Sequence, residues 1–339
     1  MTELGLLSLL LFFLDLIMKK KRYKDYSMVI TAERKKRLIR ILLISFAFLV
    51  VFFVIGIFAR YFFMQRETNR SLSVEKLQDY WNNQQYEDVF DLSEKLLEQK
   101  PMLAAARMYH GYAAYYLAIE QTEITKSLEY IDECINSLRI VLLNNKKQAE
   151  NQINYILAKA YFQKNAFSSY NYYADLVIRY FSAALKNNFF APDIPEFMGQ
   201  AYAQLGMTEE SIAAFTEALS IKESELLLHA IGEQYYIAGD YSRAKQYMFK
   251  IVQDSSDDVL VLKSRNVLGK IYLDENNLTE AKKEFEQILQ KSENYADAYY
   301  GLGIIYEKQG DMIKARSEWR KALKVQSTHS GAIQKLSNN

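Results

Sequence analysis

A spacing of 34 residues constrains the fold of this chain more than any other feature of its sequence. Near the C-terminus a glycine, a tyrosine, a small residue and an aromatic residue stand at Gly303, Tyr306, Ala315 and Trp319, and the same kinds return 34 positions earlier at Gly269, Tyr272, Ala281 and Phe285. One earlier copy carries Gly232, Tyr235, Gly239 and Ala244, and the copy before it carries Gly199, Tyr202, Gly206, Ser211, Phe215 and Ala218. A sequence with this period predicts one small unit that is stacked several times.

Each unit reads as two helices joined by a short turn. Only three residues of the 339 are proline and 12 are glycine, and helix interiors tolerate neither well. The turn position holds Gly206, Gly239, Asn276 and Gly310, residue types that adopt a left-handed backbone readily. The glycine of the first helix and the small residue of the second predict a close approach, and the bulky residue four positions later (Met248 in one copy) is expected to fill the space between units. We therefore expect an all-α fold.

These positions resemble the tetratricopeptide repeat (TPR), a family of 34-residue helix-turn-helix units. Four regular copies lie near 192–225, 225–258, 262–295 and 296–329, and three divergent copies precede them at 70–103, 104–147 and 151–191. The divergent copies keep Tyr80, Tyr86 and Pro101 in the first, Gly111 in the second, and Ala158, Tyr161 and Asn165 in the third, and the second and third are stretched. The resemblance covers residues 70–339 and implies a right-handed superhelix, an α-solenoid. The terminal stretch Ser330–Asn339 is expected to be too short for a full capping helix.

The resemblance also implies a binding surface, because family members bind peptides or partner proteins along a concave groove built mainly from first helices. In the divergent copies the register places apolar and aromatic residues there: Trp81, Met108, Tyr112, Tyr115, Tyr116, Tyr155 and Phe162. In the later copies it places mainly polar residues there: Lys263, Asn266, Lys270, Asp297, Tyr300 and Lys308. Aromatic residues often anchor interfaces, but in irregular repeats they also pack between helices. The sequence leaves open which of these roles the aromatic residues have.

Residues 41–59 (ILLISFAFLVVFFVIGIFA) contain no charged residue and have the length of one membrane-spanning helix. Ten Lys or Arg residues precede this run, between Lys19 and Arg40, whereas only Arg60, Arg66 and Arg70 directly follow it. Positive charge stays on the cytoplasmic side, which predicts a cytoplasmic N-terminus and, in a bacterium, a periplasmic repeat region. No small-residue cleavage motif follows, which favours a retained anchor over a removed signal peptide.

The predicted organisation has four parts. Residues 1–40 form a basic cytoplasmic segment, residues 41–59 a transmembrane helix, residues 60–69 a juxtamembrane linker, and residues 70–339 the solenoid, with divergent repeats over 70–191 and regular repeats over 192–329. A second apolar run, Leu4–Met18, contains Asp15 and is short for a span. It is an interfacial helix, a short span, or the product of a start codon placed too early, and the sequence leaves open whether Met1 or Met18 is the true start. The predicted side of the solenoid is the same in each case.

Charge and motifs argue against nucleic-acid binding and catalysis. Residues 1–40 hold ten basic and four acidic residues, and the remaining chain holds 32 basic and 37 acidic residues, so the repeat region is mildly acidic. The sequence has no phosphate-binding glycine loop, no His-Glu-x-x-His and no Cys-x-x-Cys. The histidines His110, His229 and His329 fall in different repeats, and the only cysteine, Cys134, lies in an apolar helical stretch. We expect no enzyme activity, cofactor or metal.

The sequence therefore favours a non-enzymatic scaffold or adaptor in a bacterial inner membrane, with its repeats in the periplasm. Family members of this build act in secretion, in envelope assembly and in the periplasmic collar of spirochaete flagellar motors, and no residue chooses among these. Three alternatives stay open: a periplasmic holdase near the translocon, a receptor whose repeats face the cytosol, and a subunit that oligomerises through its aromatic surface. The expected partners are proteins or peptide segments in the groove, and the membrane through residues 41–59, within a larger assembly.

Overall fold

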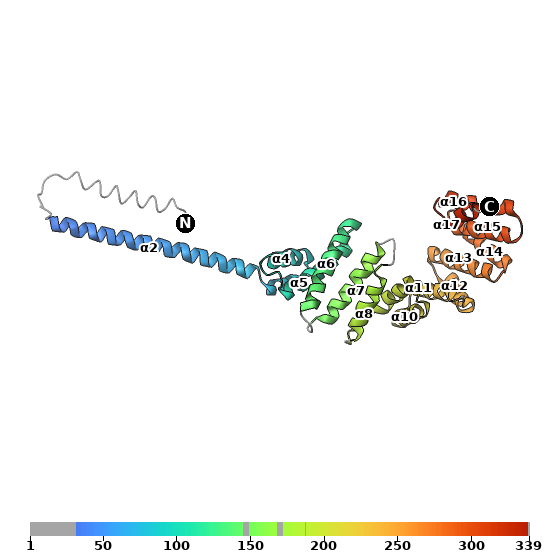
Figure 1. Cartoon of the computed structure of the whole chain (residues 1–339), viewed down its shortest axis with the longest axis horizontal. Coiled ribbons are helices and arrows are strands. Elements are labelled where there is room, and N and C mark those ends of the chain that lie inside the picture. Colours follow the sequence, from blue (N-terminus) through green and yellow to red (C-terminus); the bar gives the residue numbers. More distant parts are fainter. Residues whose placement is uncertain (1–31, 145–148, 168–171, 187, 338–339) are drawn as a thin grey trace. The chain divides into compact units, whose positions relative to one another are not determined.

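The structure is a computed structural model that describes residues 32–144, 149–167, 172–186 and 188–337. Every regular element within these ranges is a helix, labelled α2 to α17 along the chain (Figure 1). The chain divides into two units, residues 1–71 and residues 72–339. The apolar run Leu4–Met18, predicted to be interfacial or untranslated, lies outside the described residues.

The first unit is described from α2 (Ala32–Ser71), one continuous helix of 40 residues. Its segment Ile39–Phe62 is 24 residues long, is apolar enough to cross a membrane, and is not buried against any part of the chain that the structure describes. A helix of this length exceeds the ~20 residues needed for a hydrocarbon core of ~30 Å. The stretch 60–69, predicted to be a linker, is helical and continues α2 to Ser71. It contains neither glycine nor proline, so nothing in its sequence interrupts the helix.

In the second unit, the described residues form seven helix pairs and one final helix. The pairs are α3 (Val74–Asn82) with α4 (Tyr86–Gln99), α5 (Ala104–Glu120) with α6 (Ile124–Asn144), α7 (Glu150–Ala166) with α8 (Ala174–Lys186), α9 (Ile194–Gln204) with α10 (Thr208–Ile221), α11 (Glu225–Ile237) with α12 (Tyr241–Asp254), α13 (Asp258–Asp274) with α14 (Leu278–Lys291), and α15 (Ala296–Lys308) with α16 (Met312–Val325). The last helix is α17 (Ser330–Ser337). Each helix packs on the next in chain order, which confirms the predicted all-α solenoid.

The bulky residue of a second helix packs directly on the glycine of the first helix. A Cβ added at Gly269 would lie 2.7 Å from the Phe285 ring, and one added at Gly303 would lie within 3.0 Å of the Trp319 indole. Phe285 also lies against Gly301 of the following pair, and both aromatic residues are almost fully buried. The glycines therefore allow the close helix contact, and the aromatic residues fill space within and between units as predicted.

The turn inside each regular pair has one left-handed residue. The φ angles there are 72° at Gly206, 76° at Gly239, 60° at Asn276 and 84° at Gly310. In three pairs the next residue caps the N-terminus of the second helix, because its side chain accepts a hydrogen bond from the backbone N–H three positions later. These capping residues are Asp240, Asn277 and Asp311. The predicted turn positions are therefore confirmed.

Among the divergent pairs, α3–α4 keeps this turn, with φ 57° at Gln84, whereas α7–α8 departs from it. Asn165, which matches the turn position by spacing, lies inside α7 with a side chain that is almost fully buried. Its Oδ1 accepts the backbone N–H of Tyr173 at 3.0 Å, and its amide donates to Gln204. A buried amide thus holds the longer α7–α8 connection where the regular pairs use a left-handed glycine or asparagine.

The last helix, α17, packs on α16 and buries Ala332 in spite of its eight-residue length.

Candidate protein-binding face on the first helices

The residues predicted to face a partner all lie on first helices of the pairs. Trp81 lies on α3, Met108, Tyr112, Tyr115 and Tyr116 on α5, Tyr155 and Phe162 on α7, Lys263, Asn266 and Lys270 on α13, and Asp297, Tyr300 and Lys308 on α15. First helices also contact one another, most closely within the series α3–α5–α7–α9 and the series α11–α13–α15. The predicted residues of the divergent copies lie on the first series and those of the later copies on the second.

The aromatic cluster consists of Trp81, Tyr86, Tyr109, Tyr112 and Tyr116, with Trp81 at its centre. The Trp81 ring centroid lies 5.5 Å from that of Tyr86, 6.0 Å from Tyr109, and 5.7 Å from both Tyr112 and Tyr116. Tyr86 and Tyr116 stack at 4.6 Å with an angle of 10° between their planes. These separations are those of favourable aromatic pairs, so the cluster joins α3, α4 and α5.

Two residues predicted to contact a partner belong to the core. Tyr112 is 3% exposed and Tyr115 is 6% exposed. Burial raises the pKa of both hydroxyls, that of Tyr115 to about 12. Side chains this deeply packed do not reach a partner in the folded protein, so the prediction for Tyr112 and Tyr115 is wrong. Trp81, Met108 and Tyr116 are half-buried and keep part of their surface exposed.

Tyr155 and Phe162 connect α7 to the start of α9. The Tyr155 hydroxyl donates to the Asp193 carboxylate, with oxygen–oxygen distances of 3.0 and 2.8 Å, and Lys159 Nζ lies 2.8 Å from the same carboxylate. The Phe162 ring meets Phe197 edge-on at 4.7 Å. Sequence reasoning missed Lys159 and Asp193. The available signal was that Lys159 lies four residues after Tyr155, on the same face of α7.

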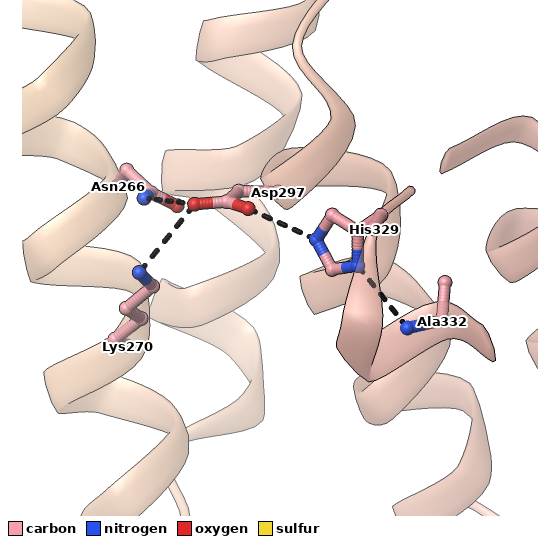
Figure 2. Close-up of polar contacts among 5 residues, drawn as sticks. All are labelled: Asn266, Lys270, Asp297, His329 and Ala332. Atoms are coloured by element: carbon pink, nitrogen blue, oxygen red, sulfur yellow. Dashed lines mark hydrogen bonds and ion pairs between the residues drawn. The ribbon is translucent and has the colours of Figure 1, made fainter. Parts of the chain in front are cut away.

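The polar cluster consists of Asn266, Lys270, Asp297 and His329, and Figure 2 shows Asp297 at its centre. Asn266 Nδ2 donates to Asp297 Oδ2 at 3.0 Å, Lys270 Nζ lies 3.5 Å from the same oxygen, and His329 Nε2 lies 3.0 Å from Oδ1. The other ring nitrogen, His329 Nδ1, accepts the backbone N–H of Ala332 at 3.1 Å. Because Nδ1 accepts, neutral His329 carries its proton on Nε2 and donates it to Asp297.

These contacts set the charge of Asp297. Burial by itself raises the pKa of the Asp297 carboxyl, but the Lys270 charge and the hydrogen bonds from His329 and Asn266 outweigh it and hold the pKa below its usual range. Asp297 is therefore an anion at neutral pH and ties α13, α15 and the start of α17 together.

Asn266 is the least satisfied member of the polar cluster. Its side chain is 6% exposed, and its Oδ1 accepts no hydrogen bond from any residue that the structure describes. A buried acceptor without a donor costs about 1–3 kcal/mol unless water or a ligand supplies one. Lys270 keeps 43% of its side chain exposed beside it. Asn266 Oδ1 itself is shielded from solvent, so the groups that the cluster offers to a partner are the exposed parts of Lys270 and Asp297.

Glu233 on α11 extends the polar surface toward the preceding pair. Its carboxylate lies 3.4 Å from His229 Nδ1. Burial raises the pKa of Glu233, but His229, Lys270 and Lys263 together lower it below its usual range. Since Lys270 acts on both Glu233 and Asp297, acidic and basic groups alternate along α11, α13 and α15. Sequence reasoning missed both histidine contacts, although His229 and Glu233 lie four positions apart on α11, a spacing that places them on one face.

The remaining predicted residues differ in their accessibility. Lys263 is exposed, and Tyr300 is half-buried with its ring 4.9 Å from that of His329. Lys308 donates to the Leu273 carbonyl oxygen at 3.3 Å, so it already stabilises the turn of the preceding pair. Lys263 and Lys308 are both exposed, but Lys308 is already bonded to the preceding pair.

The described residues show no arrangement suited to metal binding, since no group of three or more His, Cys, Asp or Glu residues among them could hold an ion. Cys134 is fully buried, and burial raises the pKa of its thiol. His110 lies 3.0 Å from the Ser93 hydroxyl and 3.6 Å from the Glu133 carboxylate, and its ring stacks on Phe90. These two residues therefore serve packing between α4, α5 and α6.

Sequence models of one repeat family match the C-terminal part of the chain. A TPR repeat model matches residues 269–310, and tetratricopeptide repeat models match residues 197–225 and 296–329. This chain is a tetratricopeptide-repeat protein. The matched residues coincide with regular copies found from the 34-residue spacing, and the pairs from α3 to α8 continue the TPR architecture toward the N-terminus.

Solved structures of other TPR proteins share the fold. The C-terminal part of a TPR repeat-containing protein from Cytophaga hutchinsonii is 15% identical with a TM-score of 0.51, over 77% of this chain and 98% of that chain. A tetratricopeptide repeat protein from Parabacteroides merdae is 16% identical with a TM-score of 0.49, over 78% and 97%. YrrB, a TPR protein with an unusual peptide-binding site, is 20% identical with a TM-score of 0.42, over 60% and 99%. A comparison with curated protein sequences gives no match.

Proposed function

We propose that this TPR protein is a non-enzymatic, membrane-anchored adaptor whose first-helix face binds segments of partner proteins. The observation that carries this proposal is the polar cluster on α13 and α15. Lys270 keeps 43% of its side chain exposed, and Asp297 keeps 39% of its side chain exposed beside it. An extended peptide would supply a carboxylate or carbonyl oxygen to Lys270 and an N–H to the Asp297 carboxylate.

The anchor in this proposal is the exposed apolar segment Ile39–Phe62 of α2. The basic residues before it favour a cytoplasmic N-terminus. The solenoid would then lie on the periplasmic side of a bacterial inner membrane, where it would organise an envelope complex. A reporter enzyme active only in the periplasm, fused after Asn339, tests the orientation. An inactive but intact fusion would favour a receptor whose repeats face the cytosol.

Partner binding is tested with the full-length protein purified from its native membrane. The variant Lys270→Glu reverses a charge in the polar cluster, and Lys283→Glu is the matched control, because Lys283 is exposed on the second helix α14. We expect a fixed set of co-purifying proteins that Lys270→Glu loses and Lys283→Glu retains. Equal sets for both variants would contradict the assigned face. Suppression of aggregation of unrelated unfolded proteins, without a fixed set, would indicate a holdase instead.

A further inference from the structure

A second candidate surface is a pocket of about 300 Å³ between α8, α9 and α10. Its apolar lining includes Leu185 of α8, Phe190 of the following connection, and Met198 of α9. Leu185 is 38% exposed and Phe190 is 63% exposed, so the wall is open to solvent. The volume is at the low end of the ~300–1,000 Å³ typical of ligand pockets, which suits one inserted side chain.

The pocket and the first-helix binding face use different sides of α9. Met198 and Tyr202, four residues apart, both line the pocket. Glu196 and Gln200 correspond by the repeat spacing to Asn266 and Lys270 of the binding face. Each lies two positions from Met198, and residues two apart on a helix point roughly 200° apart. A ligand in the pocket would therefore leave the first-helix face free, so this inference does not rest on the proposed function.

The pocket is open because α10 has small residues where the later second helices have large ones. Ala214 corresponds by the repeat spacing to Tyr247 of α12 and to Glu284 of α14. In the α13–α14 pair, Glu284 reaches across to Arg265 at 2.7 Å and is almost fully buried, which closes the equivalent place. The neighbouring lining residue Ala213 corresponds to polar residues, Gln246, Lys283 and Ser317. The α9–α10 pair alone among the regular pairs thus combines two alanines at these positions.

The charged groups that line the pocket are both acidic. Glu210 and Glu217 of α10 belong to the lining, and neither forms an ion pair with any residue that the structure describes. The lining contains no Lys or Arg. Glu210 and Glu217 are seven residues apart on one helix, which separates them by about 10 Å along its axis. Two unpaired carboxylates at this spacing, beside an apolar hollow, are complementary to two cations that flank an apolar side chain.

We propose that this pocket binds a segment of a partner protein that inserts one aromatic or aliphatic side chain between two basic residues. The carboxylate spacing specifies the partner. Its Lys or Arg residues lie about seven positions apart if the segment is helical, or about three positions apart if it is extended. The apolar anchor lies between them and packs against Met198, Leu185 and Phe190.

The test selects from a display library of random 12-residue peptides on the full-length protein in lipid nanodiscs. We expect enriched peptides to carry an apolar residue between basic residues at one of these spacings. Their affinity should fall at least tenfold for the double variant Glu210→Lys with Glu217→Lys. The matched control, Glu129→Lys with Glu293→Lys, changes the net charge equally at exposed positions outside the pocket and should retain binding.

A second variant tests the hollow itself. Ala214→Tyr introduces the residue that the next pair has at this position, and it should also abolish binding while circular dichroism and thermal melting confirm the fold. If Ala214→Tyr fails to fold, the charge-reversal pair still decides. The proposal is overturned if no peptide is enriched, if enriched peptides lack basic residues, or if the pocket and control variants bind equally. Concentration-dependent self-association that the pocket variants abolish would also overturn it, because a second copy of the chain would then be the occupant.

Discussion

The contact between a first-helix glycine and the bulky residue of the second helix leads to a prediction that two pairs of this chain test against each other. In the α15–α16 pair, a Cβ added at Gly303 would lie within 3.0 Å of Trp319 Nε1 and Cδ1. In the α11–α12 pair, a Cβ added at Gly232 would lie 2.5 Å from Met248 Cε, the end of a flexible side chain, and 3.0 Å from Tyr247 Cβ. Gly303→Ala and Gly232→Ala are therefore the same change where the closest neighbour is rigid in one pair and flexible in the other.

The expected magnitudes follow from two opposing effects. Replacing glycine by alanine inside a helix stabilises it by roughly 0.5–1 kcal/mol, whereas overpacking a core costs about 1–3 kcal/mol. The Trp319 indole is fully buried and has no flexible end to move, so Gly303→Ala should lower the local unfolding free energy by about 1–2 kcal/mol. The Met248 methyl can rotate away, so Gly232→Ala should change it by no more than ~0.5 kcal/mol in either direction.

Hydrogen exchange of the full-length protein in nanodiscs measures both variants. A loss of about 1.4 kcal/mol raises exchange through local opening roughly tenfold. Peptides from α15 and α16 should show this faster exchange in Gly303→Ala. Each peptide is compared with the same peptide of the wild type, because a terminal pair opens more readily than an inner one. Peptides from α11 and α12 should be almost unchanged in Gly232→Ala. Equal effects of the two substitutions would refute the reasoning, since rigidity of the neighbour would then not matter.

Three further predictions concern buried groups. Tyr112→Phe removes a buried hydroxyl that has no partner among the described residues, so the unfolding free energy should stay equal or rise by up to ~1 kcal/mol, whereas Tyr112→Ser should lower it by about 3 kcal/mol. Urea unfolding followed by circular dichroism measures both variants, and an unchanged stability of Tyr112→Ser would contradict the core role of Tyr112. The fold lowers the pKa of Asp297, so its contribution is present above the ordinary value of 3.8 and is lost as pH falls through the lower folded value; below about pH 4 the urea midpoint should fall more steeply for the wild type than for Asp297→Asn, and parallel curves would contradict the contacts drawn in Figure 2. Burial raises the pKa of the Cys134 thiol, so a thiol reagent should modify it only as fast as the domain unfolds, and immediate labelling of native protein would show that α6 opens locally.

Much of the fold could be predicted from the sequence because the repeat encodes it locally. Gly239 and Gly310 have the left-handed φ that their position in the pattern requires, and Asn276 has it without being glycine. Each glycine-to-aromatic contact joins residues of one or two adjacent units, so the period alone places both partners. Prediction was weaker where units are stretched. Asn165 matches the pattern but lies within α7, because its amide bonds replace the glycine turn.

The candidate binding residues could be predicted only in part. Tyr112 and Tyr116 lie four positions apart on the same face of α5, and nothing in the sequence distinguishes their roles. In the structure Tyr112 is buried while Tyr116 keeps an exposed edge. His329 and Glu233 were not predicted, because the His329–Asp297 contact joins residues 32 positions apart and the cations that act on Glu233 include Lys270 and Lys263 of the next pair.

The sequence by itself determined that this chain stacks helix pairs after an apolar helix long enough to cross a membrane, since period, turn residues and hydrophobic length are properties of the chain taken in order. The tertiary structure decided which side chains remain available. The accessibility of a side chain depends on which residues pack against it. Trp81 packs against Tyr112, whereas the small side chain of Ala214 leaves the pocket beside it open. Those opposing residues are far apart in sequence and meet only when the helices pack.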